Sequence, residues 1–167
     1  MITRLSSISQ EKLLSVFVDY LDIVYLAKTH FVERFSEVSD SANFNDLKAA
    51  IDENVYDIRN QIMRIEAIYI IIERDPDMGA CDAFVNMAEE AFYKIQKNSI
   101  DTQIRDLNIL FYMQSIENME IAAFQVLQLI ATRLKLKAVR AMLRESFDEA
   151  KEDRVLLLSI MGKMINV

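Results

Sequence analysis

Apolar residues recur at alternating steps of three and four along almost the whole chain, and few residues interrupt this pattern. Such steps place side chains on one face of an α-helix. Only two glycines and one proline occur among 167 residues, which is too few for the many tight turns of a sheet-rich fold. We therefore expect an all-α fold, in a single domain that spans residues 1–167.

Five helices are predicted from the positions at which the pattern stops. The predicted segments are 10–38, 47–72, 80–97, 102–134 and 136–164. Asn43 and Asp46 are candidate caps before the second segment, and a change in the phase of the pattern places a turn at residues 135–137. Short connections between long helices predict an antiparallel four-helix bundle. The short helix lies between the second and third long ones.

Polar residues stand on the apolar seams near the middle of three of these helices. They are Asn54 and Gln61 in the second segment, Glu120 in the fourth and Asp153 in the fifth. Antiparallel helices of similar length bring their middles together, so we expect these side chains to share one or two layers of the bundle. A buried carboxylate costs free energy unless it is paired. This polar layer is therefore the candidate site.

Charge and composition narrow the possible partners and the location. A net charge of −7 disfavours nucleic acids and anionic membranes, because both need a basic face. No apolar run approaches the length of a transmembrane helix, and the first residues lack the apolar core of a signal peptide. The single Cys81 excludes an internal disulfide and a cysteine-rich zinc site. We therefore expect a cytoplasmic protein with no membrane or nucleic-acid partner.

Five segments carry a resemblance to a known family. They read LDIVYLAKTHF, LKAAIDENVYDIRNQIMRIEAIY, DPDMGACDAFVNMAEEA, SIENMEIAAFQVLQLIATRL and MLRESFDEAKEDRVLL. Their order and spacing resemble the YciE/YciF-like branch of the ferritin-like proteins, which are bacterial helical bundles associated with stress responses. The resemblance covers nearly the whole chain. It implies a ferritin-like bundle with a di-metal centre between its helices.

The ligand pattern that this resemblance implies is incomplete in the chain. A di-metal centre needs carboxylates from all four long helices, and a histidine one turn from a carboxylate on two of them. Ala27 stands where the first helix should supply an acid, and Ala150 replaces an acid in the last helix. Asn118 stands where a histidine is common. The full di-metal centre of a di-iron oxidoreductase therefore lacks ligands.

The candidate ligands that remain are Glu120, Asp153, Asp57, Glu117, Glu149 and His30. Two interpretations of this set are open. In the first, the acids belong to a buried network with Asn54, Gln61 and Arg34, and the protein has no cofactor. In the second, they bind one divalent metal ion, which is iron, manganese or zinc.

Three classes of function follow from these interpretations. The leading one is a non-catalytic, stress-associated structural or interaction protein that has lost its di-metal centre. The alternative is a metal-binding protein with one residual carboxylate site, and the last is a di-iron oxidoreductase, so the sequence favours a non-enzymatic role. We also expect a homodimer through the long helices. Candidate contacts are the apolar residues Tyr25, Phe44, Tyr69, Ile70 and Phe111.

Overall fold

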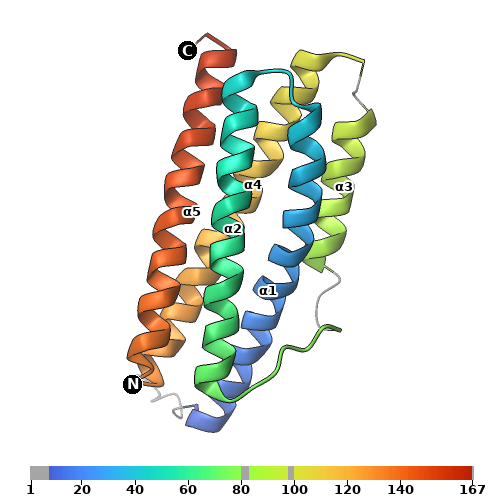
Figure 1. Ribbon diagram of the computed structural model, residues 1–167. Helices are drawn as coiled ribbons and strands as arrows, with labels where there is room; N and C mark the ends of the chain where they lie inside the picture. The colour runs from blue at the N-terminus through green and yellow to red at the C-terminus, as the bar shows by residue number, and fades with distance from the viewer. Residues whose placement is uncertain (1–7, 80–82, 98–99, 167) are drawn as a thin grey trace, which may run out of the picture.

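Residues 8–79, 83–97 and 100–166 are described by the computed structural model, and they form five α-helices. The helices are α1 (Gln10–Ser41), α2 (Asn45–Ile72), α3 (Ala83–Lys97), α4 (Thr102–Arg133) and α5 (Lys137–Met164). The four long helices lie side by side, and each runs antiparallel to its neighbours in the ring α1, α2, α5, α4 (Figure 1). The short α3 packs on the outside against α1 and α4. The predicted all-α class is confirmed.

The connections between the helices agree with most of the sequence prediction. Lys135 takes a left-handed backbone conformation, with a φ of 61°, and it lies just after the end of α4, within the predicted turn. Capping of α2 differs from the prediction, because its N-cap residue is Phe44 and no side chain of the α1–α2 turn caps it. The predicted start of the third helix at Ala80 lies outside the described residues, as does Cys81.

Asp106 of α4 supplies the hydrogen-bond acceptor at the start of α2 that the predicted caps, Asn43 and Asp46, do not supply. Its buried carboxylate accepts hydrogen bonds from the backbone N–H of Asn43, at 3.1 Å, and of Phe44, at 2.8 Å. A helix N-terminus carries unpaired N–H groups and a partial positive charge, so a carboxylate is favoured there. This contact fixes the α1–α2 turn to a helix that lies far away in the sequence.

The core consists of two clusters of buried apolar side chains, one towards each end of the bundle. One cluster includes Phe31, Phe35 and Ile58, and the other includes Phe17, Ile65 and Phe124. Buried polar side chains interrupt the apolar packing near the middle of the long helices. The structure therefore places the predicted polar residues inside the core, with Asn54, Gln61, Glu120 and Asp153 all buried.

The inward face of α1 differs from the prediction in one respect. The steps of three and four that predict the first helix place Tyr20 on its inward face, but Tyr20 is 44% exposed, whereas Leu21 is fully buried. Among the candidate dimer contacts, Tyr69 is wrong, because its side chain is buried. Its hydroxyl donates to Asp22, and burial and this hydrogen bond to a carboxylate raise its pKa. Ile70 and Phe111 are exposed as expected.

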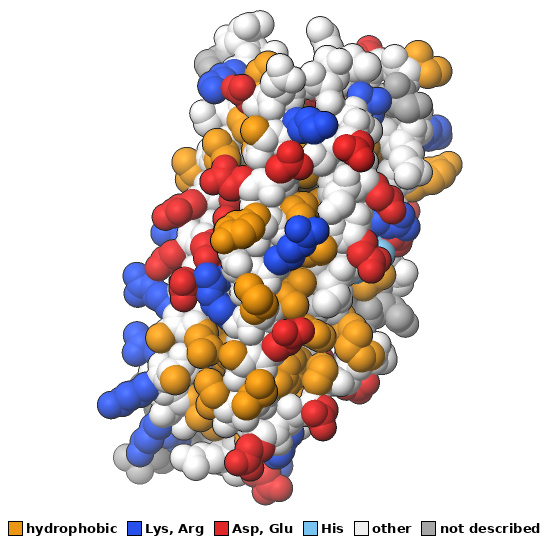
Figure 2. Space-filling model, in the orientation of Figure 1, with side chains coloured by type: hydrophobic (Ala, Val, Ile, Leu, Met, Phe, Trp, Pro, Cys, Tyr) orange, Lys and Arg blue, Asp and Glu red, His pale blue; other side chains and the backbone are white. Residues whose placement is uncertain are grey.

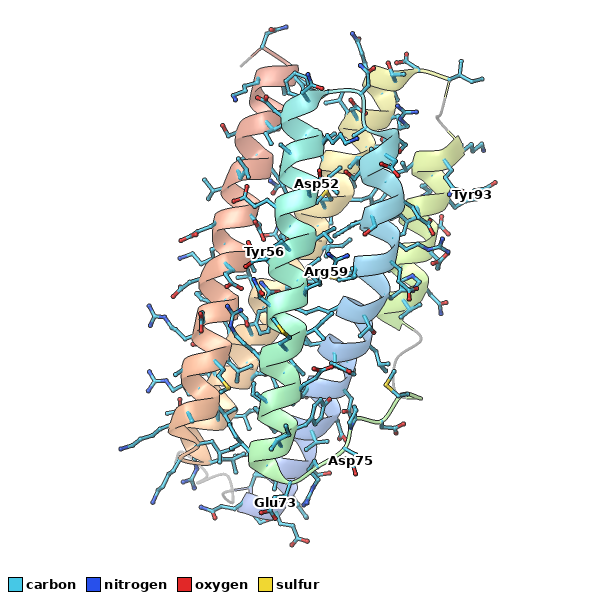
Figure 3. All side chains as sticks on the ribbon, in the orientation of Figure 1. Asp52, Tyr56, Arg59, Glu73, Asp75 and Tyr93 are labelled. Atoms are coloured by element: carbon cyan, nitrogen blue, oxygen red, sulfur yellow. The ribbon has the colours of Figure 1, made fainter. Side chains whose placement is uncertain are left out.

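The outer face of α2 combines apolar and charged side chains. In the view of Figure 2, hydrophobic side chains gather over the lower half of the molecule. Tyr56 and Arg59 project from α2 towards the viewer in Figure 3, and both are exposed. Among the described helices, none is long and apolar enough to span a membrane.

Candidate functional site

The centre of the polar layer is an ion pair between α1 and α4. Lys28 is fully buried, and its Nζ lies 2.6 Å from Oε2 of Glu120. The same ammonium donates to Oε1 of Gln61 on α2, and it lies 5.2 Å from the centre of the Phe124 ring. Charge-assisted hydrogen bonds and the electron-rich face of an aromatic ring both stabilise a buried cation. The ammonium therefore has partners on three sides.

Asn54 connects two further acids one layer away. Its side-chain Nδ2 donates to Oε1 of Glu117 at 2.7 Å and to Oδ2 of Asp153 at 2.9 Å. Glu117, like Asn54, has only 1% of its surface exposed. One amide group thus holds carboxylates from α4 and α5 against α2. The predicted meeting of the helix middles is confirmed for these residues.

Burial of Glu117 and Asp153 disfavours their charged forms, and their pKa values are raised accordingly. Burial raises the pKa of Glu117 well above its ordinary value, and repulsion from Glu120 and Asp153 adds to this shift. Burial also raises the pKa of Asp153 to about 7, although the hydrogen bond from Asn54 acts in the opposite direction. Both shifts favour the neutral acid, which has a proton to donate and needs no counter-ion.

Glu149 and Asp57 lie at the edge of this layer, where α2 meets α5. Both carboxylate oxygens of Glu149 accept from Arg64, at 2.7 and 2.5 Å, and one of them also accepts from Gln61 at 3.0 Å. Burial raises the pKa of Asp57, and repulsion from Glu149 raises it further. Gln61 therefore links the Lys28 ion pair to a second, half-buried ion pair.

His30 lies away from the layer, although it is two residues from Lys28. A separation of two residues turns a side chain by about 200° around a helix, so the two side chains point in different directions. The Nε2 atom of His30 lies 2.7 Å from Oε1 of Glu89 on α3. Arg34 binds both oxygens of the same carboxylate, each at 2.8 Å. His30 and Arg34 thus connect α1 to α3.

The layer does not fit the di-metal centre that the resemblance implies. Ala27 and Ala150 are buried and offer no oxygen. Glu120 is bound to Lys28, and Glu149 is bound through both oxygens to Arg64. Within the part of the chain that the structure describes, no three His, Cys, Asp or Glu side chains are arranged to hold a metal ion.

The sequence analysis missed Arg64 and, at the centre of the layer, Lys28. The buried face of α1 runs through Phe17, Leu21, Val24, Lys28, Phe31 and Phe35. These steps of four and three are also present in the sequence, so the signal was a lysine on an apolar seam. Ala27, the residue before it, is buried as well, so the apolar pattern of this helix also continues through Ala27 and does not by itself single out the lysine.

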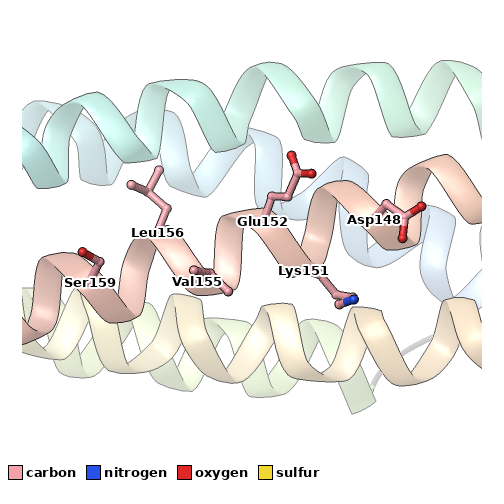
Figure 4. Close-up of a pocket in the computed structure, with 6 residues that line it drawn as sticks. All are labelled: Asp148, Lys151, Glu152, Val155, Leu156 and Ser159. Carbon is pink, nitrogen blue, oxygen red and sulfur yellow. The ribbon is translucent and has the colours of Figure 1, made fainter.

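One surface hollow lies apart from this layer. It has a volume of about 710 Å³, and its lining comes from one helix, α5 (Figure 4). The lining residues are Asp148, Lys151, Glu152, Val155, Leu156 and Ser159. One face of α5 provides all of them, so the hollow lies on the surface and outside the buried layer.

Comparison with known proteins places this arrangement in a family. A family model described as "Domain of unknown function (DUF892)" matches residues 12–167. The structure is similar to that of YcfI from Rhodopseudomonas palustris, for which a structural role is suggested, with 18% identity and a TM-score of 0.81 over 94% of this chain and 96% of that one. A search of the curated proteins finds no match.

A second similar structure bears directly on the resemblance seen in the sequence. It is the E. coli stress protein YciF, with 19% identity and a TM-score of 0.77 over 92% of this chain and 97% of that one. At such low identity, these structures show a shared fold. The family match covers nearly the whole chain, which therefore belongs to the DUF892 family of YciF-like proteins.

Proposed function

We propose that this protein is a non-catalytic, ferritin-like scaffold that acts through its surface in a stress response. The observation that supports this most is the buried Lys28 ammonium, 2.6 Å from Glu120. It supplies from a side chain the positive charge that metal ions supply in a ferritin-like di-metal centre. A protein with this internal neutralisation has no need of a metal ion to hold its acids together.

The rest of the layer supports the same proposal. Asn54 and Gln61 present amide N–H groups to Glu117, Asp153 and Glu149, so these acids have hydrogen-bond donors where a metal site has cations. The raised pKa values of Glu117 and Asp153 further reduce the negative charge that needs a counter-ion. The roles named for the similar structures, structural for YcfI and stress-related for YciF, agree with a scaffold.

One observation favours the alternative of a single residual cation site. Three buried oxygen atoms have no hydrogen-bond partner among the described residues, namely Oδ1 of Asn54, Oε2 of Glu117 and Oε1 of Glu120. Oxygen atoms of this kind are ligands for hard divalent cations. The proton that Glu117 holds competes with such a cation, which is why we rank this function second.

Elemental analysis distinguishes the two functions. The purified protein is stripped with EDTA and then incubated without oxygen with ferrous iron, manganese or zinc, and excess metal is removed. The scaffold proposal predicts that far less than one metal ion per chain is retained, and that no metal-dependent oxygen consumption occurs. Retention of one ion per chain, lost in Glu120→Ala and kept in the exposed control Glu152→Ala, contradicts the scaffold and establishes the cation site.

A further inference from the structure

A small pocket opens at one end of the bundle, where the ends of α1 and α3 meet the start of α4. This is the upper end of the molecule in Figure 1. The pocket has a volume of about 170 Å³, and its apolar wall consists of the buried side chains of Val38, Phe92 and Ile95. Phe92 packs edge-to-face on Phe35 of α1, with 5.8 Å between the ring centroids. This contact holds the α3 side of the pocket against α1.

The guanidinium of Arg105, in the first turn of α4, is the charged group of this pocket with hydrogen-bonding capacity to spare. Its side chain is only 14% exposed, and its buried Nε atom has no hydrogen-bond partner among the residues that the structure describes. The acid beside it is Asp106, whose Oδ1 lies 3.9 Å from Nε, which is too far for a hydrogen bond. Buried polar groups in proteins are nearly always paired. An unpaired donor at the wall of a pocket therefore indicates a partner from outside the chain.

The acids near Arg105 already have donors of their own. Asp106 accepts from two backbone N–H groups at the start of α2. Glu37, at the rim of the pocket, accepts from Arg34 at 3.0 Å. The planar fork of a guanidinium matches the two oxygens of a carboxylate, which accept two parallel hydrogen bonds from it. A carboxylate from solution is thus the acceptor that fits Arg105 best.

The apolar wall determines what the carboxylate must carry. A cavity of about 150 Å³ holds one benzene molecule, so a pocket of about 170 Å³ accepts an apolar group of that size. Val38, Phe92 and Ile95 offer no polar atom from their side chains, and an aromatic ring can pack on the ring of Phe92. An apolar wall with one charged group that fixes orientation is typical of small-molecule sites.

We propose that this pocket binds a small carboxylate with an aromatic or branched apolar body. Arg105 holds the carboxylate, and Val38, Phe92 and Ile95 hold the body. The site goes beyond the scaffold function and is separate from the polar layer, since Val38 follows Lys28 by ten residues, or about 15 Å along α1. Ligand binding and metal retention therefore succeed or fail independently.

Titration of the full-length protein with benzoate tests the site. NMR follows the backbone amides and the Nε–H group of Arg105. We expect saturable shifts at Arg105, Phe92 and Ile95, with a dissociation constant on the order of 1 mM, as for a ligand of this size. Benzamide has the same shape without the charge, and acetate has the charge without the ring, so each should bind at least about 10-fold more weakly. Both comparisons use the native chain.

One substitution tests the role of the guanidinium. Arg105→Met removes the charge and keeps an unbranched apolar side chain, so it should weaken benzoate binding about 10-fold or more. Arg59→Met, at an exposed position on α2, is the matched control and should leave binding unchanged. Circular dichroism verifies that both variants remain helical.

Three results would each overturn the proposal. The first is the absence of saturable shifts at Phe92, Ile95 and Arg105 at benzoate concentrations far above the expected dissociation constant. The second is benzoate binding by a helical Arg105→Met variant that is as tight as in the native chain. The third is equal binding of benzoate, benzamide and acetate to the native chain, which would show that neither the charge nor the apolar wall selects the ligand.

Discussion

Lys28 and Glu120 form an ion pair in the centre of the bundle, with 2.6 Å between Nζ and Oε2, although they are 92 positions apart in the sequence. Two buried charges cost desolvation energy, which their attraction and added hydrogen bonds offset only when the geometry is good. Here Gln61 adds a hydrogen bond and Phe124 an aromatic face. Each charge therefore depends on the other, and removal of one leaves the other buried without a partner.

The stability of the fold should depend on pH through Asp153. Its pKa is raised to about 7, against an ordinary value near 4. The folded chain then binds more protons than the unfolded chain between about pH 4 and pH 7, so the free energy of unfolding falls as the pH rises through this range. The full penalty, on the order of 4 kcal/mol, is present above pH 7. Urea denaturation at several pH values between 5 and 8 measures this fall in the free energy of unfolding.

Asp153→Asn isolates this contribution. An asparagine keeps an oxygen that accepts from Nδ2 of Asn54 but carries no charge at any pH. We therefore expect the variant to be more stable than the native chain at pH 8 and to differ less from it at pH 5. A difference between the two chains that does not change with pH contradicts the raised pKa. Asp148→Asn, a substitution on the outer face of α5, is the control.

Asp106 should contribute to stability as a cap supplied from another helix. Its carboxylate accepts from the N–H groups of Asn43 and Phe44, so Asp106→Ala leaves two N–H groups at the start of α2 without this acceptor. We expect a loss of about 2 kcal/mol in the free energy of unfolding. Amide hydrogen exchange should show faster exchange at Asn43 and Phe44. Unchanged exchange at these two amides contradicts the assigned role.

The hydroxyl of Tyr69 should stabilise a buried acid near the other end of the bundle. It donates to Asp22, and both side chains are buried. Tyr69→Phe keeps the ring but leaves the carboxylate without this donor, so we expect a loss of about 1–3 kcal/mol in thermal or urea unfolding. Tyr20→Phe, at an exposed position on α1, should change stability by less than about 0.5 kcal/mol. Equal effects of the two substitutions on stability would contradict the role assigned to the Tyr69 hydroxyl.

Much of the fold was predictable because the apolar pattern of a helix such as α5 has a single phase. In α5, buried residues recur at steps of four and three from Val139 to Ile160, so one phase of the pattern accounts for the whole inner face. α1 has apolar residues on both sides of its seam, so a single sequence allows two phases. A phase that includes Tyr20 is wrong, because Tyr20 is exposed. Ala27 is buried as expected, but a pattern drawn through Ala27 leaves out Lys28 at the centre of the polar layer.

The apolar pattern of the sequence does not predict which side chains of distant segments contact one another. The cap of α2 comes from Asp106, 62 residues after Phe44, and local rules search only the residues beside a helix end. Glu120 and Asp153 were correctly placed in the core because they interrupt apolar seams. Their partners depend on the rotation of each helix against its neighbours, which periodicity alone does not determine.

The stability coupling between Lys28 and Glu120, measured in the presence of EDTA, tests the central claim most directly. Unfolding by urea is compared for the native chain, Lys28→Met, Glu120→Leu and the double variant. Each single substitution should cost about 3–5 kcal/mol, and the double variant should cost far less than the sum, with a coupling of at least about 2 kcal/mol. Additive losses, together with a native chain that EDTA itself destabilises, would show that a metal ion and not Lys28 neutralises the centre.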